Sequence, residues 1–178
     1  FGVDDAAATG VNWALAPMID VTRDPRWGRI AESFGECVLL TSTLGAAMVR
    51  GFQGDSLAAS GSIAACAKHF AGYGAVESGR DYATTNIPEH ELRNVHLPPF
   101  QVAVRAGVCT VMASFSSWNG VKVHADDTLL TFVRRLHRSV QKKIKIIITQ
   151  FYCTSVFESW RHFDKHERGL PFSIGIEW

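Results

Sequence analysis

The chain has 178 residues, of which 47% are hydrophobic and 20% are charged, a composition that is ordinary for one soluble globular domain. No apolar run approaches the roughly 20 residues that a membrane helix needs, which excludes a membrane-spanning protein. The 4 cysteines form no Cys-x-x-Cys pair, so the sequence indicates neither a zinc site nor a small disulfide scaffold.

The net charge of +1 is distributed unevenly along the chain. Residues 1–132 contain 9 Lys and Arg against 13 Asp and Glu, whereas residues 133–178 contain 9 against 4. Such a shift is typical either of an anionic partner or of a change of origin along the chain. The basic stretch over residues 134–145 lacks a nucleic-acid-binding module and interleaved aromatic residues, so we expect no nucleic-acid partner and no membrane partner.

The first predicted elements alternate between strand and helix. Residues 11–17 are typical of a short buried strand, and residues 23–29 form a loop fixed by Pro25 and Gly28. Apolar residues then recur at helical spacing over residues 36–52, which predicts a helix that faces a core. Residues 62–67 are apolar on both faces, as buried parallel strands are.

Glycines at 72, 74 and 79 predict a flexible, close-approach loop. A proline followed by acidic residues at 88–91 is typical of a helix start, and this helix extends toward residue 106 with a disturbance at Pro98-Pro99. Residues 109–114 form a third buried strand.

The last elements are a turn at Asn119-Gly120, a helix over about 125–135 and an Ile-rich strand over 145–149. Strands that alternate with helices, with no tight two-residue hairpin between them, predict a parallel sheet with right-handed crossovers. After residue 149 the pattern loses its period, and its one signal is a helix around 154–163.

Polar clusters follow two of the predicted strands. Asp24-Pro25-Arg26-Trp27-Gly28-Arg29 comes after the apolar residues 14–19, and Lys68-His69 ends the run that begins at Ala64. Because the carboxyl ends of parallel strands meet on one face, we expect these two clusters to share a polar pocket.

Several segments together resemble the N-terminal barrel domain of glycoside hydrolase family 3, the β-glucosidase and exo-glucanase type. The resemblance covers about residues 9–131 and implies an α/β fold, an incomplete TIM-like (β/α) barrel over 1–131, with a diverged or disrupted segment over 132–178. The matching segments are Gly10-Val11-Asn12-Trp13, Ala16 to Asp20, Arg23 to Gly35, Ala64 to Tyr73, Gly79-Arg80-Asp81-Tyr82, Leu97 to Phe100 and Ser114 to Gly120.

The resemblance also implies a site. Family members hydrolyse terminal β-linked sugars with retention, so the expected partner is a β-linked glucoside or oligosaccharide, with no cofactor and no metal. Arg29, Lys68 and His69 match family positions that hydrogen-bond the sugar hydroxyls, and Arg80 and Asp81 match a polar loop beside them. The family analogy favours a periplasmic or secreted protein. The chain begins at Phe1 without a signal-peptide pattern, so we expect a fragment or a processed form of unassigned oligomeric state.

The chemistry of these side chains agrees with that assignment, and alternatives remain open. Arg29 and Lys68 supply charged donors for hydroxyl oxygens, and His69 can donate or accept. Lys68-His69 also fits a buried ion pair with a nearby acid. Trp27 and Trp118 fit either stacking on a sugar ring or simple packing, and packing is the more frequent role. For Arg23, Asp24 and Arg26 we favour a salt-linked loop.

The two carboxylates of a retaining glycosidase, which lie roughly 5 to 5.5 Å apart, are missing from their expected places. Gln150 stands where the family has its Asp nucleophile, and an amide cannot form the glycosyl ester. Glu177 is a remote second candidate that requires a long insertion, and the acid/base Glu belongs to a following domain. We therefore expect a chain that is inactive by itself. The alternatives are a non-catalytic carbohydrate-binding or interaction fragment, or a chain that does not fold stably.

Overall fold

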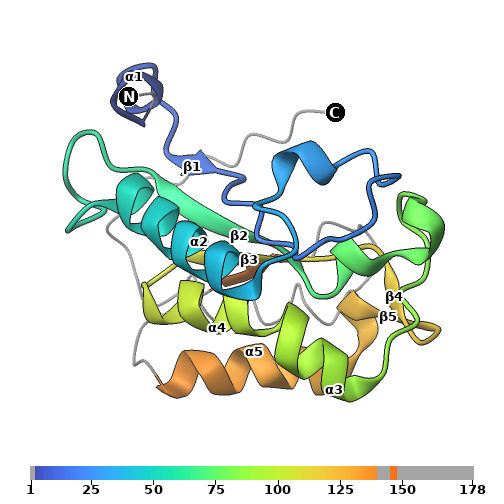
Figure 1. Ribbon diagram of the computed structural model, residues 1–178. Coiled ribbons are helices and arrows are strands. Elements are labelled where there is room, and N and C mark those ends of the chain that lie inside the picture. The colour runs from blue at the N-terminus through green and yellow to red at the C-terminus, as the bar shows by residue number, and fades with distance from the viewer. Residues whose placement is uncertain (1–2, 140–144, 148–178) are drawn as a thin grey trace. The chain divides into compact units, whose positions relative to one another are not determined.

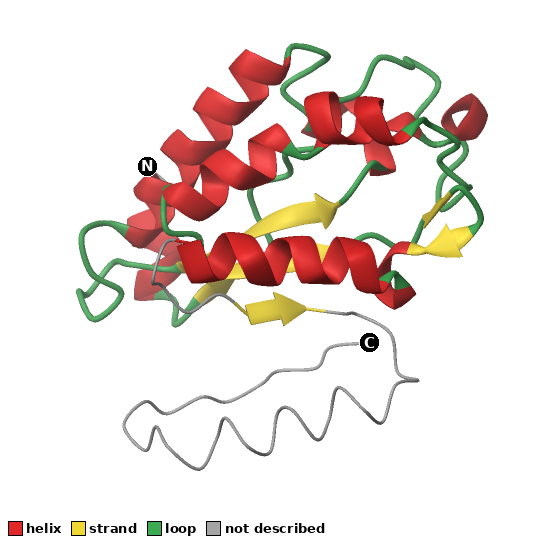
Figure 2. Ribbon diagram, turned by 90° about the horizontal axis from the view of Figure 1, so that it is seen from below, coloured by secondary structure: helices red, strands yellow, loops and turns green. Residues whose placement is uncertain are grey.

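The computed structural model describes residues 3–139 and 145–147, which belong to a compact unit spanning Phe1–Ile148. Its main sheet has the order β1-β2-β3-β6, formed by Trp13–Ala14, Ala64–Phe70, Thr110–Ala113 and Lys145–Ile147. All three strand pairings are parallel (Figures 1 and 2). The predicted α/β class and the incomplete (β/α) barrel are confirmed. The helix predicted around 154–163 lies outside the described residues.

Helices cover the sheet and bury its apolar residues. Helix α2 (Val38–Gln53) packs against β2 and against α4 (Pro98–Arg105), and α5 (Asp127–Ser139) follows beside α4 (Figure 1). Helix α5 continues through residue 131 without a break. The core between these elements includes Ile19, Val49, Ala65, Phe70, Phe100, Val111 and Val133. No helix of the described part of the chain is long and apolar enough to cross a membrane.

The first strand is shorter than the predicted 11–17. Strand β1 contains Trp13 and Ala14 alone, and the chain then follows β2 through single hydrogen bonds. Pro17 accepts from Lys68 N–H at 3.1 Å, and Ile19 N–H donates to the Lys68 carbonyl at 2.8 Å. A proline has no N–H for a regular ladder, which explains the early end of the strand. The arrangement places Asp20 beside the end of β2.

The predicted helix over 88–106 is divided in three. A short turn, α3 (Glu89–Glu91), leads into the π-helical turn η4 (Leu92–His96), and α4 begins at Pro98. The disturbance was expected at the prolines and lies one turn before them, where Leu97 N–H donates to the carbonyl of Leu92. Pro98 and Pro99 occupy the first turn of α4, where a missing N–H costs no hydrogen bond.

The turn predicted at Asn119-Gly120 joins two short strands that were not predicted and that lie outside the parallel sheet. Strands β4 (Ser117–Trp118) and β5 (Val121–Lys122) pair antiparallel across Asn119-Gly120. Both turn residues have positive φ, 48° and 90°, which matches the backbone of a two-residue hairpin turn. A short helix, α1 (Val3–Ala8), was also not predicted.

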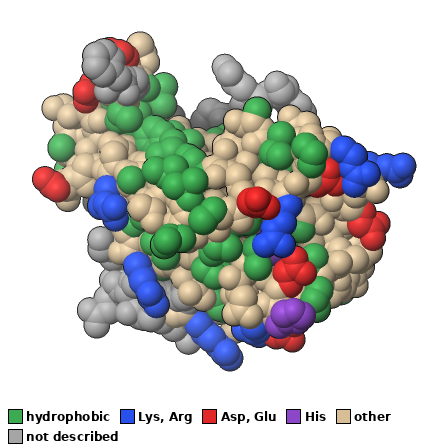
Figure 3. Space-filling model, in the orientation of Figure 1, with side chains coloured by type: hydrophobic (Ala, Val, Ile, Leu, Met, Phe, Trp, Pro, Cys, Tyr) green, Lys and Arg blue, Asp and Glu red, His purple; other side chains and the backbone are tan. Residues whose placement is uncertain are grey.

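One face of the molecule exposes apolar side chains next to the edge of the sheet. Leu39 on α2 is 76% exposed, and the other large apolar residues of this face are Val11, Trp13, Leu15, Leu40, Leu44 and Met48. Hydrophobic side chains gather there over β1 and α2 (Figure 3). Strand β1 has no partner on its outer side within the described residues. An open edge beside an apolar helix surface is typical of a barrel wall without its next strand.

Candidate functional site

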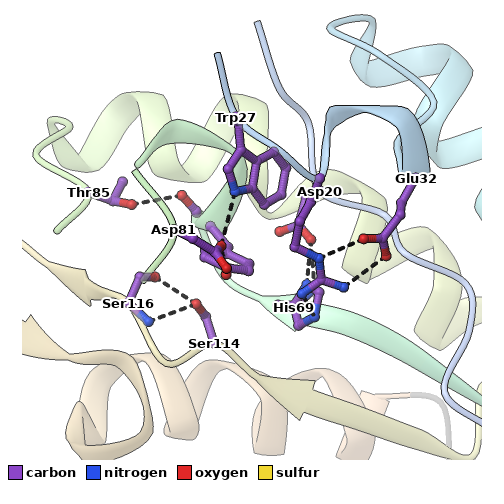
Figure 4. Close-up of polar contacts among 11 residues, drawn as sticks. Asp20, Trp27, Glu32, His69, Asp81, Thr85, Ser114 and Ser116 are labelled. Carbon is purple, nitrogen blue, oxygen red and sulfur yellow. Dashed lines mark hydrogen bonds and ion pairs between the residues drawn. The ribbon is translucent and has the colours of Figure 1, made fainter. Parts of the chain in front are cut away.

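Polar side chains converge at the carboxyl ends of the parallel strands. Asp20 follows the segment that accompanies β2, His69 lies at the end of β2, and Ser114 follows β3 directly. The register of β2 against β3 shifts between Lys68 and Phe70. Such an irregularity changes the direction of side chains at a strand end. In Figure 4, Asp20 lies above His69, and the carboxylate of Glu32 points toward the side chains next to His69.

Asp20 and His69 form a buried pair. Asp20 Oδ2 accepts the backbone N–H of His69 at 3.0 Å and lies 2.9 Å from its ring Nδ1. The two residues are 2% and 7% exposed. A nearby acid therefore hydrogen-bonds His69, as one of the two alternatives expected, whereas no salt bridge joins Lys68 to a described acid.

Arg29 is oriented by three hydrogen bonds. Its Nε and Nη2 donate to the two carboxylate oxygens of Glu32 at 2.7 and 2.8 Å, and Nη1 lies 3.0 Å from His69 Nε2. The hydrogen bond from Arg29 lowers the pKa of Glu32 and, in turn, raises the pKa of Arg29, although burial opposes both shifts. The guanidinium stays charged, and its side chain remains 25% exposed.

Lys68 lines a cavity of about 400 Å³ in the same region. The cavity wall also includes Glu32, whose pKa the Lys68 charge helps to lower. No carboxylate of the described residues forms an ion pair with Lys68, which is half-buried. The remaining lining residues are Leu15, Ala16, Met18, Phe34 and Met48.

Tyr73 joins the two polar clusters. Its ring meets Trp27 and His69 edge-on, each with ring centroids 4.9 Å apart, and lies 5.8 Å from the Arg29 guanidinium carbon. Burial and the neighbouring Asp81 raise the pKa of Tyr73, so the phenol stays protonated. The Tyr73 ring therefore lies between the Arg29–His69 contact and the loop that carries Asp81.

The two predicted loop residues differ in placement. Asp81 accepts hydrogen bonds from the hydroxyl of Tyr73 and from Trp27 Nε1, the latter at 3.3 Å (Figure 4). Arg80 is exposed, and its side chain makes no hydrogen bond or ion pair to the described residues. The structure therefore connects Asp81, Arg29 and His69, and does not connect Arg80 to them.

The two tryptophans are packed. Trp27 is 1% exposed, and Trp118 Nε1 donates to the carbonyl of Ile87 at 3.0 Å. The salt-linked loop is also present. Asp24 pairs with Arg26 at 2.6 Å, which lowers the pKa of the Asp24 carboxyl to about 2.

Each described carboxylate of the cluster has at least one hydrogen-bond partner, although Oδ1 of Asp20 has none among the described residues. Asp20 holds His69, Glu32 holds Arg29, and Asp81 holds Tyr73 and Trp27. Gln150 and Glu177 lie outside the described residues. Within residues 3–139 and 145–147, no group of three His, Cys, Asp or Glu side chains could hold a metal ion.

Sequence reasoning missed three members of the cluster: Asp20, Glu32 and Tyr73. A signal for Asp20 was present, because this acid follows an apolar segment directly, in the position where parallel strands deliver polar side chains. Glu32 lies three residues after Arg29, a spacing that allows an ion pair within one helical turn. Tyr73 carried no such signal.

Known proteins resemble both the sequence and the fold. The model of the glycosyl hydrolase family 3 N-terminal domain matches residues 3–139. A periplasmic β-glucosidase of Salmonella typhimurium is 45% identical over 131 residues, which cover 74% of this chain and 17% of that protein.

Two solved structures show the same architecture. The exo-1,3/1,4-β-glucanase of a Pseudoalteromonas species matches with a TM-score of 0.73 and 41% identity, over 82% of this chain and 18% of that chain. The β-glucosidase of Listeria innocua in complex with glucose matches with a TM-score of 0.73 and 38% identity, over 82% and 21%. The chain thus spans about a fifth of the length of these relatives.

Proposed function

The chain belongs to glycosyl hydrolase family 3, and from that membership we propose that its polar cluster recognises the terminal sugar of a β-linked glucoside or oligosaccharide. One observation carries the proposal: Glu32 and His69 hold the Arg29 guanidinium in place, and the Arg29 side chain still remains 25% exposed. Fixed donors beside a cavity suit the vicinal hydroxyls of a sugar. The glucose complex of the Listeria innocua relative supports the same substrate class.

The roles within the cluster follow from donor chemistry. Arg29 offers a planar fork and Lys68 offers a mobile ammonium with three donors, so together they reach neighbouring hydroxyl oxygens. His69 contributes its ring from the strand end, and Asp81 fixes the aromatic wall behind it. Arg80, exposed at the rim of the loop, is proposed as an outer contact for a longer substrate.

The binding proposal is tested by calorimetric titration of the chain with glucose and with cellobiose. We expect weak, saturable binding that Lys68→Ala lowers at least about tenfold, because a hydrogen bond to a charged group contributes roughly 1.5 to 3 kcal/mol. Lys122→Ala removes an exposed lysine from the hairpin and serves as the control. Equal affinities of all three proteins, or no binding by any of them, would sink the proposal.

We propose that the complete activity is retaining hydrolysis of β-glucosides in carbohydrate metabolism, and that this chain alone does not catalyse it. The reaction requires a pair of carboxylates roughly 5 to 5.5 Å apart, and each described carboxylate of the cluster already holds a neighbour. The chain should release no nitrophenol from an aryl β-glucoside above the buffer rate. Turnover that Lys68→Ala abolishes would show that the chain contains its own catalytic pair.

The engaged carboxylates also favour the second candidate function, a non-catalytic carbohydrate-binding fragment. It differs from the first in one measurable respect, because adding the remaining domains of a relative would not create hydrolysis. The Salmonella relative and the family analogy support a periplasmic or secreted location. Fractionation of cells that express the complete gene tests that location.

A further inference from the structure

Asp20, His69 and Arg29 form a row in which each group contacts the next. Asp20 Oδ2 lies 2.9 Å from His69 Nδ1, and His69 Nε2 lies 3.0 Å from Arg29 Nη1. We propose that Asp20 is a positioning residue that fixes His69 as the neutral ring protonated on Nδ1, so that Nε2 is a hydrogen-bond acceptor in the sugar-binding cluster. This inference rests on the proposed function and specifies which atoms of the site donate hydrogen bonds and which accept them.

The donor inventory decides where the ring proton lies. A guanidinium nitrogen can only donate, so the Nε2 atom that Arg29 contacts must present its lone pair. The single proton of a neutral ring is then on Nδ1, where the Asp20 carboxylate accepts it. A doubly protonated ring would place two donors 3.0 Å apart, beside the charge of Arg29.

Asp20 holds the ring through one carboxylate oxygen, while its other oxygen, Oδ1, is buried without a hydrogen-bond partner among the described residues. The same Oδ2 accepts both the ring Nδ1–H and the backbone N–H of His69, so one oxygen fixes the side chain and the main chain together. The carboxylate is almost fully buried, and the edge of Tyr73 meets the ring at an interplanar angle of 83°. These contacts leave the ring one orientation, with Nε2 toward Arg29.

The protonation of His69 decides which hydrogen bonds the cluster can form with the hydroxyl groups of a sugar. Arg29 and Lys68 can only donate, whereas a hydroxyl group both donates and accepts. The single lone pair of the neutral His69 Nε2 already accepts from Arg29 Nη1 at 3.0 Å, so the ring orients the guanidinium instead of accepting from a sugar hydroxyl. The neutral ring therefore holds Arg29 in place, and the donors that meet sugar hydroxyl oxygens are those of Arg29 and Lys68.

The protonation of His69 is measured by long-range proton–nitrogen NMR of the ¹⁵N-labelled chain, assigned by the signals that disappear in His69→Gln. At mildly alkaline pH we expect Nδ1 to give the signal of a protonated nitrogen and Nε2 that of an unprotonated one. The pattern should persist in Arg29→Met, because Asp20 remains. In the double variant Arg29→Met with Asp20→Ala, the proton should distribute over both nitrogens. Asp24→Asn is the matched control, an acid of the same segment that pairs with Arg26.

A His69 ring protonated on Nε2, or on both nitrogens, in the unmodified chain overturns the proposal. So does a ring that loses its Nδ1 proton in Arg29→Met, and so does a folded double variant that keeps it. The first two results need no change at Asp20, so they decide the matter even when the double variant does not fold. The readout contains no sugar, and it therefore separates failure of this inference from failure of the proposed function.

Discussion

Replacing Arg29 with alanine is expected to abolish calorimetrically detectable binding of glucose to the chain. The change removes the donors of the cluster's guanidinium and leaves Glu32 without the two hydrogen bonds that orient it. It also takes a donor from His69 Nε2. Loss of one charge-assisted hydrogen bond to the sugar, about 1.5 to 3 kcal/mol, corresponds to a fall in affinity of roughly tenfold to more than a hundredfold.

The matched control for Arg29→Ala is Arg26→Ala. Both arginines belong to the same loop segment, and both form an ion pair with an acid nearby in the sequence. Arg26 is exposed and pairs with Asp24, outside the contacts of His69 and Tyr73. We expect its loss to change the glucose affinity by no more than about twofold. Equal losses in the two variants would contradict the assignment of Arg29, provided that circular dichroism shows both to be folded.

Gly74→Ala is expected to destabilise the chain by about 3 kcal/mol or more, measured as the free energy of unfolding in urea. A Cβ atom at this position would lie 2.3 Å from the Val21 carbonyl oxygen and 3.1 Å from the Thr22 Cβ. The obstacle is main chain, so no side-chain rotation relieves it. Relief requires movement of the segment that carries Asp20, and we expect the variant to lose glucose binding as well.

Gly28→Ala is the control for that prediction. No heavy atom lies within 4 Å of a Cβ at position 28, and its φ lies outside the left-handed region. The same chemical change should therefore alter the free energy of unfolding by less than about 1 kcal/mol. A Gly74→Ala chain as stable as Gly28→Ala would show that the loop and the Val21 segment do not approach each other closely.

The sequence predicted the features that depend on local patterns. Continuous apolar runs located the strands around Ala65 and Val111, helical spacing located α2, and a capping sequence at Asp126-Asp127 located the start of α5. The rule that parallel strands deliver polar residues to one edge brought Arg29 and His69 together, and the structure places them in contact. Among the described residues, the sugar-binding positions that the family resemblance named share this edge, with the exception of Arg80.

The missed features depend on contacts between distant segments. Asp20 and His69 are 49 positions apart, and nothing local to either one identifies the other as its partner. Tyr73 acquires its role from the packing of three elements around its ring. The π-helical turn at 92–96 depends on how the chain is constrained on both sides, which local propensity does not encode. The hairpin differs, because Asn119-Gly120 is a local turn signal from which we predicted the turn but not its two short strands.

The extent of the family domain remains a prediction for the last part of the chain. The sequence pattern placed its end near residue 131, with a diverged segment over 132–178, while Gln150 was assigned to the nucleophile position. The family match extends to residue 139. Sequencing the transcript across 128–178 tests whether another reading frame restores an Asp at the nucleophile position.

We propose that the strand-end cluster of Arg29, Lys68 and His69 binds a sugar. The most direct test is a glucose titration of the ¹⁵N-labelled chain followed by proton–nitrogen NMR. We predict saturable shifts of the Lys68 and His69 backbone amides and of the Arg29 side chain, with the hairpin around Asn119 unaffected. Shifts confined to the hairpin, or no saturable shift at the cluster, would contradict the claim.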